Sequence, residues 1–184
     1  LFILLYKVGD TMAAHMTTPF YLDIGFSTTE IGAVVKLFGF WATIIGSIVG
    51  GVLMLRIGIY RALWAFGILQ ALSTAGFALL AQVGYNLSAL TAVIAFENLS
   101  AGMGTAAFVA FMASLTNKKF TATQYALLSS LMGIPRVIVA APTGYFAEWL
   151  GWTVFFALCA LIAIPGLLLL TRFRGWLTDA ADAR

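Results

Sequence analysis

Five ionisable side chains lie inside stretches that are otherwise apolar and long enough to span a bilayer. They are Lys7, Asp10, Lys36, Glu97 and Arg136. A charge at mid-membrane depth costs at least ~2.5–3.5 kcal/mol on insertion scales, so it persists where it faces a polar cavity or a partner of opposite charge. Both signs occur here, in four different segments. The pattern predicts a polar interior within a helical membrane bundle, suited to substrate binding or proton exchange.

The acids and the cations of this interior suit different tasks. Asp10 and Glu97 are the candidates for proton carriage, because burial and neighbouring charges shift the pKa of a carboxyl group. The cations suit an anionic substrate group, with Arg able to pair in a bidentate manner. The candidates for substrate binding are these cations and one amide in the same stretches: Lys7, Lys36, Asn98 and Arg136.

A structural interpretation stands beside the functional one. Lys7 and Asp10 are three residues apart, so on a helix they form a neighbouring ion pair. Glu97 and Arg136 are both predicted near mid-depth, where they can pair with each other as internal stabilisation. His15 is interpreted as a pore-lining or interface residue. These roles do not exclude transport, because a transporter can break such pairs during its cycle.

Composition places these residues in a membrane protein. The 184 residues are 62% hydrophobic and 9% charged, whereas soluble domains carry about 25% charged residues. No catalytic motif and no Cys/His cluster for a metal occurs in the sequence, so we expect no enzyme, no metal and no cofactor. The net charge of +3 is scattered over loops and gives no indication of nucleic-acid binding.

Hydrophobic stretches predict an all-α fold with six transmembrane helices. The second helix has a start signal in Ser27 and Glu30, which fit a capping box. The apolar sequence begins within a span and lacks an initiator Met, so we expect the chain to continue a longer protein. The predicted spans are residues 1–22, 30–55, 60–82, 87–115, 121–148 and 152–171.

Charges in the loops predict the orientation. The loop after the second span carries Arg56 and Arg61, and the loop after the fourth carries Lys118 and Lys119. Because positive residues stay on the cytoplasmic side, both termini of the segment are predicted to be cytoplasmic. The GxxxG spacing of Gly46 and Gly50 predicts close helix packing.

A loop pattern gives the first resemblance to a known family. The sequence GGVLMLRIGIYR (50–61) resembles the loop signature of the major facilitator superfamily. The residues that match it are Gly50, Gly51, Arg56, Gly58 and Arg61. The resemblance implies glycines at a tight helix contact and basic residues on the cytoplasmic side. Leu55 departs from the pattern, since an acidic residue often stands before the first Arg.

Longer blocks resemble a narrower family. YKVGD (6–10), TTEIGAVVKLFG (28–39), FEN (96–98), GMGTAAFVAFMASL (102–115) and FTATQYALLSSL (120–131) are similar, in this order, to the C-terminal half of AmpG-type muropeptide permeases. The resemblance implies proton-coupled import of anhydromuropeptides across the bacterial inner membrane, for peptidoglycan recycling. A related acetyl-coenzyme A transporter family shares part of the pattern and is the alternative.

The resemblance also implies a partner. The family fold has two six-helix halves with the substrate between them, so the expected partners are muropeptide, protons, lipid and an N-terminal half. That half is supplied by the same protein, by a split gene or by a dimer. A membrane-embedded half that binds a partner without transporting is the alternative from a different functional class.

Overall fold

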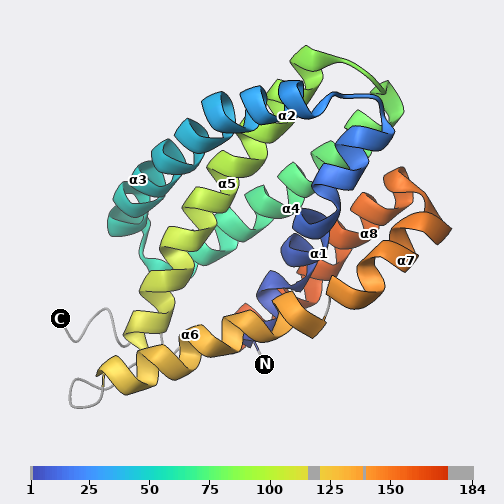
Figure 1. The fold of residues 1–184 in the computed structure, drawn as a ribbon. Helices are drawn as coiled ribbons and strands as arrows, with labels where there is room; N and C mark the ends of the chain where they lie inside the picture. Colours follow the sequence, from blue (N-terminus) through green and yellow to red (C-terminus); the bar gives the residue numbers. More distant parts are fainter. Residues whose placement is uncertain (1, 116–120, 139, 174–184) are drawn as a thin grey trace.

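The protein is described by a computed structural model that covers residues 2–115, 121–138 and 140–173, in which helices are joined by short turns. A π-helical turn, Val35–Gly39, continues α2 directly into α3, and a short 3-10 turn, Leu170–Phe173, ends α8. The α-helices, shown in Figure 1, are α1 (Phe2–Asp23), α2 (Thr28–Val34), α3 (Phe40–Ile57), α4 (Ile59–Val83), α5 (Leu87–Ser114), α6 (Thr121–Ile138), α7 (Ala140–Leu150) and α8 (Trp152–Leu169).

The predicted spans coincide with helices of the structure, the second with α2 and α3 and the fifth with α6 and α7. The all-α fold is confirmed for the described residues. Four segments are long and apolar enough to cross a membrane: Thr28–Ile57, Ile59–Val83, Leu87–Ser114 and Trp152–Arg172. Among the described residues, α1, α6 and α7 do not meet that measure. In α1 the polar side chains around Lys7 and Asp10 reduce the apolar content. The count of six spans therefore stays a prediction.

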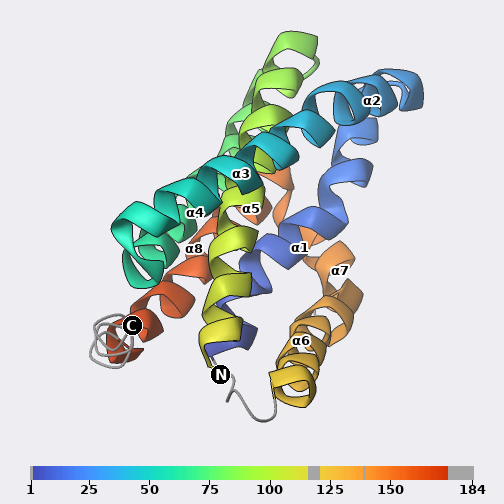
Figure 2. The ribbon, with the colours of Figure 1, turned by 90° about the vertical axis from the view of Figure 1, so that its left-hand side faces the viewer.

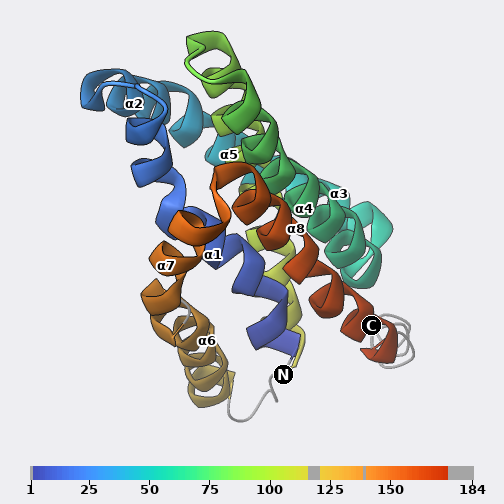
Figure 3. The same ribbon diagram turned by 90° about the vertical axis from the view of Figure 1, so that its right-hand side faces the viewer.

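The helices pack in an order that differs from their order along the chain. α5 contacts both α3 and α4, α4 also contacts α8, and α8 contacts α1. α6 and α7 contact α1, and Figures 2 and 3 show α1 between that pair and α8. α1 therefore has one side toward the bundle core and another toward α6, which allows its polar residues to face two different environments.

Glycines set the closest helix contacts. A Cβ at Gly46 would collide with the Leu99 carbonyl, and one at Gly50 would lie 2.6 Å from the Met103 Cα. In the other direction, a Cβ at Gly102 would lie 2.5 Å from the Thr43 carbonyl oxygen. The GxxxG prediction is thus confirmed as a contact between α3 and α5, where small residues let the backbones approach.

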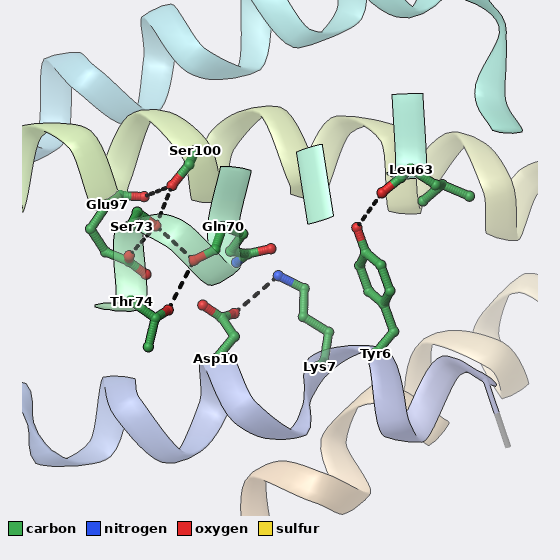
Figure 4. A network of polar contacts seen from close by, with 9 residues as sticks. All are labelled: Tyr6, Lys7, Asp10, Leu63, Gln70, Ser73, Thr74, Glu97 and Ser100. Atoms are coloured by element: carbon green, nitrogen blue, oxygen red, sulfur yellow. Dashed lines mark hydrogen bonds and ion pairs between the residues drawn. The ribbon is translucent and has the colours of Figure 1, made fainter. Parts of the chain in front are cut away.

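Two apolar clusters occupy opposite ends of the bundle. One includes Phe20, Phe77 and Phe156, and the other includes Leu63 and Phe108. Along α1, α4 and α5, polar residues lie between the segments that feed the two clusters. We call this set the polar layer; it consists of Lys7, Asp10, Gln70, Ser73, Thr74, Glu97 and Ser100 (Figure 4).

One end of the bundle is closed by contacts between three turns, and we call it the capped end. Ser27 and Glu30 form the predicted capping box at the start of α2. Tyr85, in the turn between α4 and α5, donates a hydrogen bond to Glu30 at 2.6 Å. Trp152 at the start of α8 donates to Asp23 at 2.5 Å. The turns after α1, α4 and α7 therefore lie together, as expected when successive segments run antiparallel.

Candidate functional site

The first part of the candidate site is an ion pair on α1. Lys7 Nζ lies 3.1 Å from an Asp10 carboxylate oxygen, and the two side chains are 12% and 22% exposed. The pair confirms the predicted contact between positions three apart. Because both side chains lie partly away from solvent, the interaction is screened less than a surface pair would be. Both residues also reach the open cavity described below.

The second part is Glu97, which is held by hydroxyl groups of two helices. Ser73 of α4 lies 2.5 Å from the Glu97 carboxylate, and Ser100 of α5 donates to Ser73 at 2.7 Å. A serine hydroxyl carries one proton, so Ser73 donates either to Glu97 or to the Gln70 carbonyl oxygen, which is 2.9 Å away. Figure 4 shows this network crossing between the two helices. Glu97 is therefore fixed in place by residues distant in sequence.

The two acids belong to one electrostatic site. The Asp10 and Glu97 carboxyl groups are near enough to act on each other electrostatically, and Lys7 also acts on Glu97. With both acids ionised, these three residues sum to a charge of −1, and one bound proton brings the sum to zero. Since charge in a low-dielectric interior is costly, the arrangement favours proton uptake or the arrival of a compensating cation.

An open polar cavity adjoins this site. Its volume is about 540 Å³, within the range of small-molecule sites. α1 supplies most of its lining, α5 contributes Thr105, and α6 contributes Ser129 and Gly133. Among the described residues, the lining consists of Lys7, Asp10, Thr11, Ala14, His15, Thr105, Ser129 and Gly133. The expectation that His15 lines a pore fits this position.

Two of the remaining substrate candidates, Lys36 and Asn98, do not line the cavity. Lys36 is exposed and lies in the π-helical turn, and it is not part of the cavity lining. Asn98 accepts a hydrogen bond from Thr43 at 3.1 Å and donates to the Ile94 carbonyl at 2.8 Å, so its amide serves the contact between α3 and α5. Arg136 belongs to α6, but its side chain lies outside the part of the chain that is described.

The loop motif has mixed roles in the structure. Gly50 makes the close contact with α5 described above, whereas a Cβ at Gly51 would meet nothing within 4 Å. Gly58 ends α3 with a φ of 81°, a conformation that favours glycine. Arg56 and Arg61 are exposed. The glycine contact is therefore explained by packing, and the two arginines remain free to face a membrane surface or solvent.

Sequence reasoning missed the α4 side of the site. Gln70, Ser73 and Thr74 are buried polar residues, and they share one face of α4 through their i, i+3, i+4 spacing. That spacing within an otherwise apolar helix was the available signal. Uncharged side chains give a weaker indication than charges, since serine and threonine also occur in membrane helices without a binding role.

Comparison with known proteins decides the family. The sequence profile described as Major Facilitator Superfamily matches residues 2–182. The chain belongs to this superfamily. Its members are transporters, and the superfamily places the chain among transporters and not among enzymes.

Three individual proteins are similar to more than nine tenths of the chain. The chain is 47% identical over 171 residues to the "Anhydromuropeptide permease" of Escherichia coli strain K12. The aligned region covers 92% of the chain and 35% of that relative. It is 43% identical over 177 residues to an "Uncharacterized protein" of Haemophilus influenzae (92% and 42%). It is 40% identical over 174 residues to the "Putative transporter AmpG 1" of Rickettsia prowazekii (95% and 39%).

These matches confirm the resemblance to AmpG-type permeases. The chain spans between about a third and about two fifths of the length of these relatives. The matches cover more than nine tenths of the chain.

Proposed function

We propose that this chain is the C-terminal six-helix half of a transporter that imports anhydromuropeptides together with protons. The observation that carries the proposal is the 47% identity, over 92% of the chain, to a protein named anhydromuropeptide permease. The expected location is the bacterial inner membrane, with both termini of the segment on the cytoplasmic side.

The open cavity supports a polar, anionic substrate. A muropeptide carries sugar hydroxyls and carboxylates. Lys7 supplies a cation at the cavity wall, while Thr105 and Ser129 supply hydroxyl groups. Arg136 follows Gly133 by three positions on α6, so it is on the same helical face as a residue of the lining. Transporters of this kind bind substrate near the bilayer midplane between their halves, which is the depth predicted for these residues.

The polar layer supports proton coupling. Asp10 lines the cavity and interacts with Glu97, which is held inside the bundle by Ser73. A substrate carboxylate that draws Lys7 away would leave Asp10 without its ion-pair partner. Proton binding to one of the two acids then restores a neutral interior. This link between substrate and proton is the mechanism that we propose for coupling.

Uptake by the complete transporter tests the function. Membrane vesicles that contain it should accumulate labelled anhydromuropeptide when an inward proton gradient is applied, and a protonophore should abolish the accumulation. Accumulation of acetyl-coenzyme A in place of muropeptide would identify the sister family. Absence of uptake for both substrates, with folded protein in the membrane, would leave the non-transporting alternative.

Accessibility labelling tests the six-span topology. Single cysteines that replace Ser88 and Lys118 should react from opposite sides of the membrane, with position 88 accessible from the periplasm. Position 88 directly follows the turn at the capped end. Labelling of both positions from the periplasm would contradict the topology.

A further inference from the structure

Gln70 of α4 has a side-chain nitrogen that no residue in the described ranges accepts a hydrogen bond from. The residue is 5% exposed, and its side-chain nitrogen Nε2 is buried without a hydrogen-bond partner among the described residues. A buried amide donor that is left unpaired costs about 1–3 kcal/mol. Such a group calls for a hydrogen-bond partner other than the described side chains.

The amide of Gln70 lies between α5 and α1. A Cβ at Gly104 of α5 would lie 2.9 Å from the Gln70 side-chain oxygen, so the glycine leaves room for the amide. Figure 4 shows the amide nitrogen on the side of Asp10. The side chain therefore spans the space between α5 and α1 within the polar layer.

A small cavity lies beside this amide. Its volume is about 10 Å³, which is room for about one water molecule. The lining combines polar groups from α1 and α4 with apolar groups from α8. It consists of Tyr6, Asp10, Gly67, Gln70, Ala71, Thr74, Cys159, Ala163 and Leu167.

The polar groups of the lining match what a buried water needs, which is two to four hydrogen-bond partners. Gln70 Nε2 can donate to the water oxygen, and the Asp10 carboxylate can accept from one water hydrogen. Thr74 donates its own proton to the Gln70 carbonyl at 3.0 Å, so its oxygen can accept the second water hydrogen. Donors and acceptors thus balance around one molecule.

We propose that Gln70 holds one buried water molecule that donates a hydrogen bond to Asp10. The water approaches Asp10 from the small cavity, whereas Lys7 lines the open cavity. Gln70 is thereby a positioning residue, which keeps Asp10 hydrogen-bonded when Lys7 turns toward a substrate. This role in the cycle rests on the proposed transport function, but the water site itself does not. Other titratable groups near Asp10 are Tyr6, Lys7, Glu97 and Cys159.

Infrared difference spectroscopy of the complete transporter, without substrate, tests the water site. Water labelled with ¹⁸O shifts the O–H stretching band of a bound, buried water and identifies it. Gln70→Met keeps the length of the side chain and removes the donor, so the band should disappear. Gln82→Met makes the same change at an exposed position of α4 and should leave the band intact.

A second variant removes the water from another wall. Ala163→Val reduces the cavity from the side of α8 and leaves Gln70 in place, so it should also abolish the band. A band that persists unchanged in both Gln70→Met and Ala163→Val would overturn the proposal, and so would the absence of any buried-water band in the unmodified protein.

Transport measurements then address the role of the water in the cycle. Gln70→Met should lower gradient-driven accumulation several-fold at unchanged abundance, and Gln82→Met should not. If muropeptide is not transported at all while the water band still depends on Gln70, the proposed function fails and the water site stands. If transport proceeds and the band does not depend on Gln70, the water site fails alone.

Discussion

The capped end and the polar layer use the same chemistry in opposite surroundings. At the capped end, the Glu30 carboxylate accepts hydrogen bonds from Ser27 and Tyr85, and these side chains face outward. In the polar layer, the Glu97 carboxylate interacts with Ser73, which is fully buried between two helices. One acid is bound by its own turn and a neighbouring turn, and the other by residues brought together only by helix packing.

The difference shows where a polar group needs a functional explanation. An exposed acid keeps its hydration, so its contacts add little and cost little. A buried acid loses hydration and is tolerated only with partners. The capped end is thus explained by helix termination alone. The polar layer lies between two apolar clusters, at a position where apolar side chains would have made one continuous core. That position is why we place coupling in the polar layer.

Loss of the cation should give the largest stability difference between the two regions. Lys7→Met leaves the partly buried Asp10 carboxylate without its ion pair, and we expect a loss of about 3 kcal/mol, the low end for breaking a buried pair. Glu30→Gln at the capped end should cost much less. Unfolding of the complete transporter in mixed detergent micelles at neutral pH measures both. Equal losses for the two variants would remove the distinction between the regions.

Removal of one serine hydroxyl compares the regions with a matched substitution. Ser73→Ala takes away a donor to Glu97 and an acceptor for Ser100, and we expect a loss of roughly 2–3 kcal/mol. Ser27→Ala removes a helix N-cap at the protein surface and should cost about 1 kcal/mol. The same unfolding assay applies. A Ser27→Ala variant less stable than Ser73→Ala would show that the capped end carries more of the fold than we infer.

Alkaline titration should give the smallest effect. The hydrogen bond to Glu30 raises the pKa of Tyr85 above its ordinary value of 10.0. Stability from this bond is present below pH 10 and is lost as the pH rises through the raised pKa, because the ionised phenol cannot donate. In Glu30→Gln, one tyrosine should therefore ionise at lower pH in an absorbance titration. The control Glu148→Gln, at an exposed position, should leave the titration unchanged.

The local features of the fold could be predicted from sequence, because short-range patterns determine them. Ser27 and Glu30 fit the capping-box spacing, and the structure has that box. The pairing of Lys7 with Asp10 follows from helical periodicity. The apolar stretches predicted the positions of the helices, because the length of an apolar stretch is also a short-range pattern. Within a helix, a three- or four-residue spacing is enough to place two side chains together.

Features that depend on packing could not be predicted in this way. The π-helical turn at Val35–Gly39 places Lys36 on an exposed surface. No residue pattern in the sequence predicted this turn. Asn98 is next to Glu97 in the sequence and was predicted to bind substrate. In the structure its side chain accepts a hydrogen bond from Thr43 of α3. Gln70 joins the site because α4 packs against α5 opposite Gly104. Each of these outcomes depends on which helices become neighbours.

Proton-coupled accumulation by carboxylate variants tests the central claim most directly. Complete transporter is reconstituted in liposomes as the unmodified protein, Asp10→Asn, Glu97→Gln and the capped-end control Glu30→Gln. Each is measured for muropeptide accumulation under a pH gradient and for substrate exchange without one. We predict that Asp10→Asn or Glu97→Gln loses accumulation and keeps exchange, while Glu30→Gln accumulates normally. Normal accumulation by both Asp10→Asn and Glu97→Gln, at normal protein abundance, would contradict the coupling role of the polar layer.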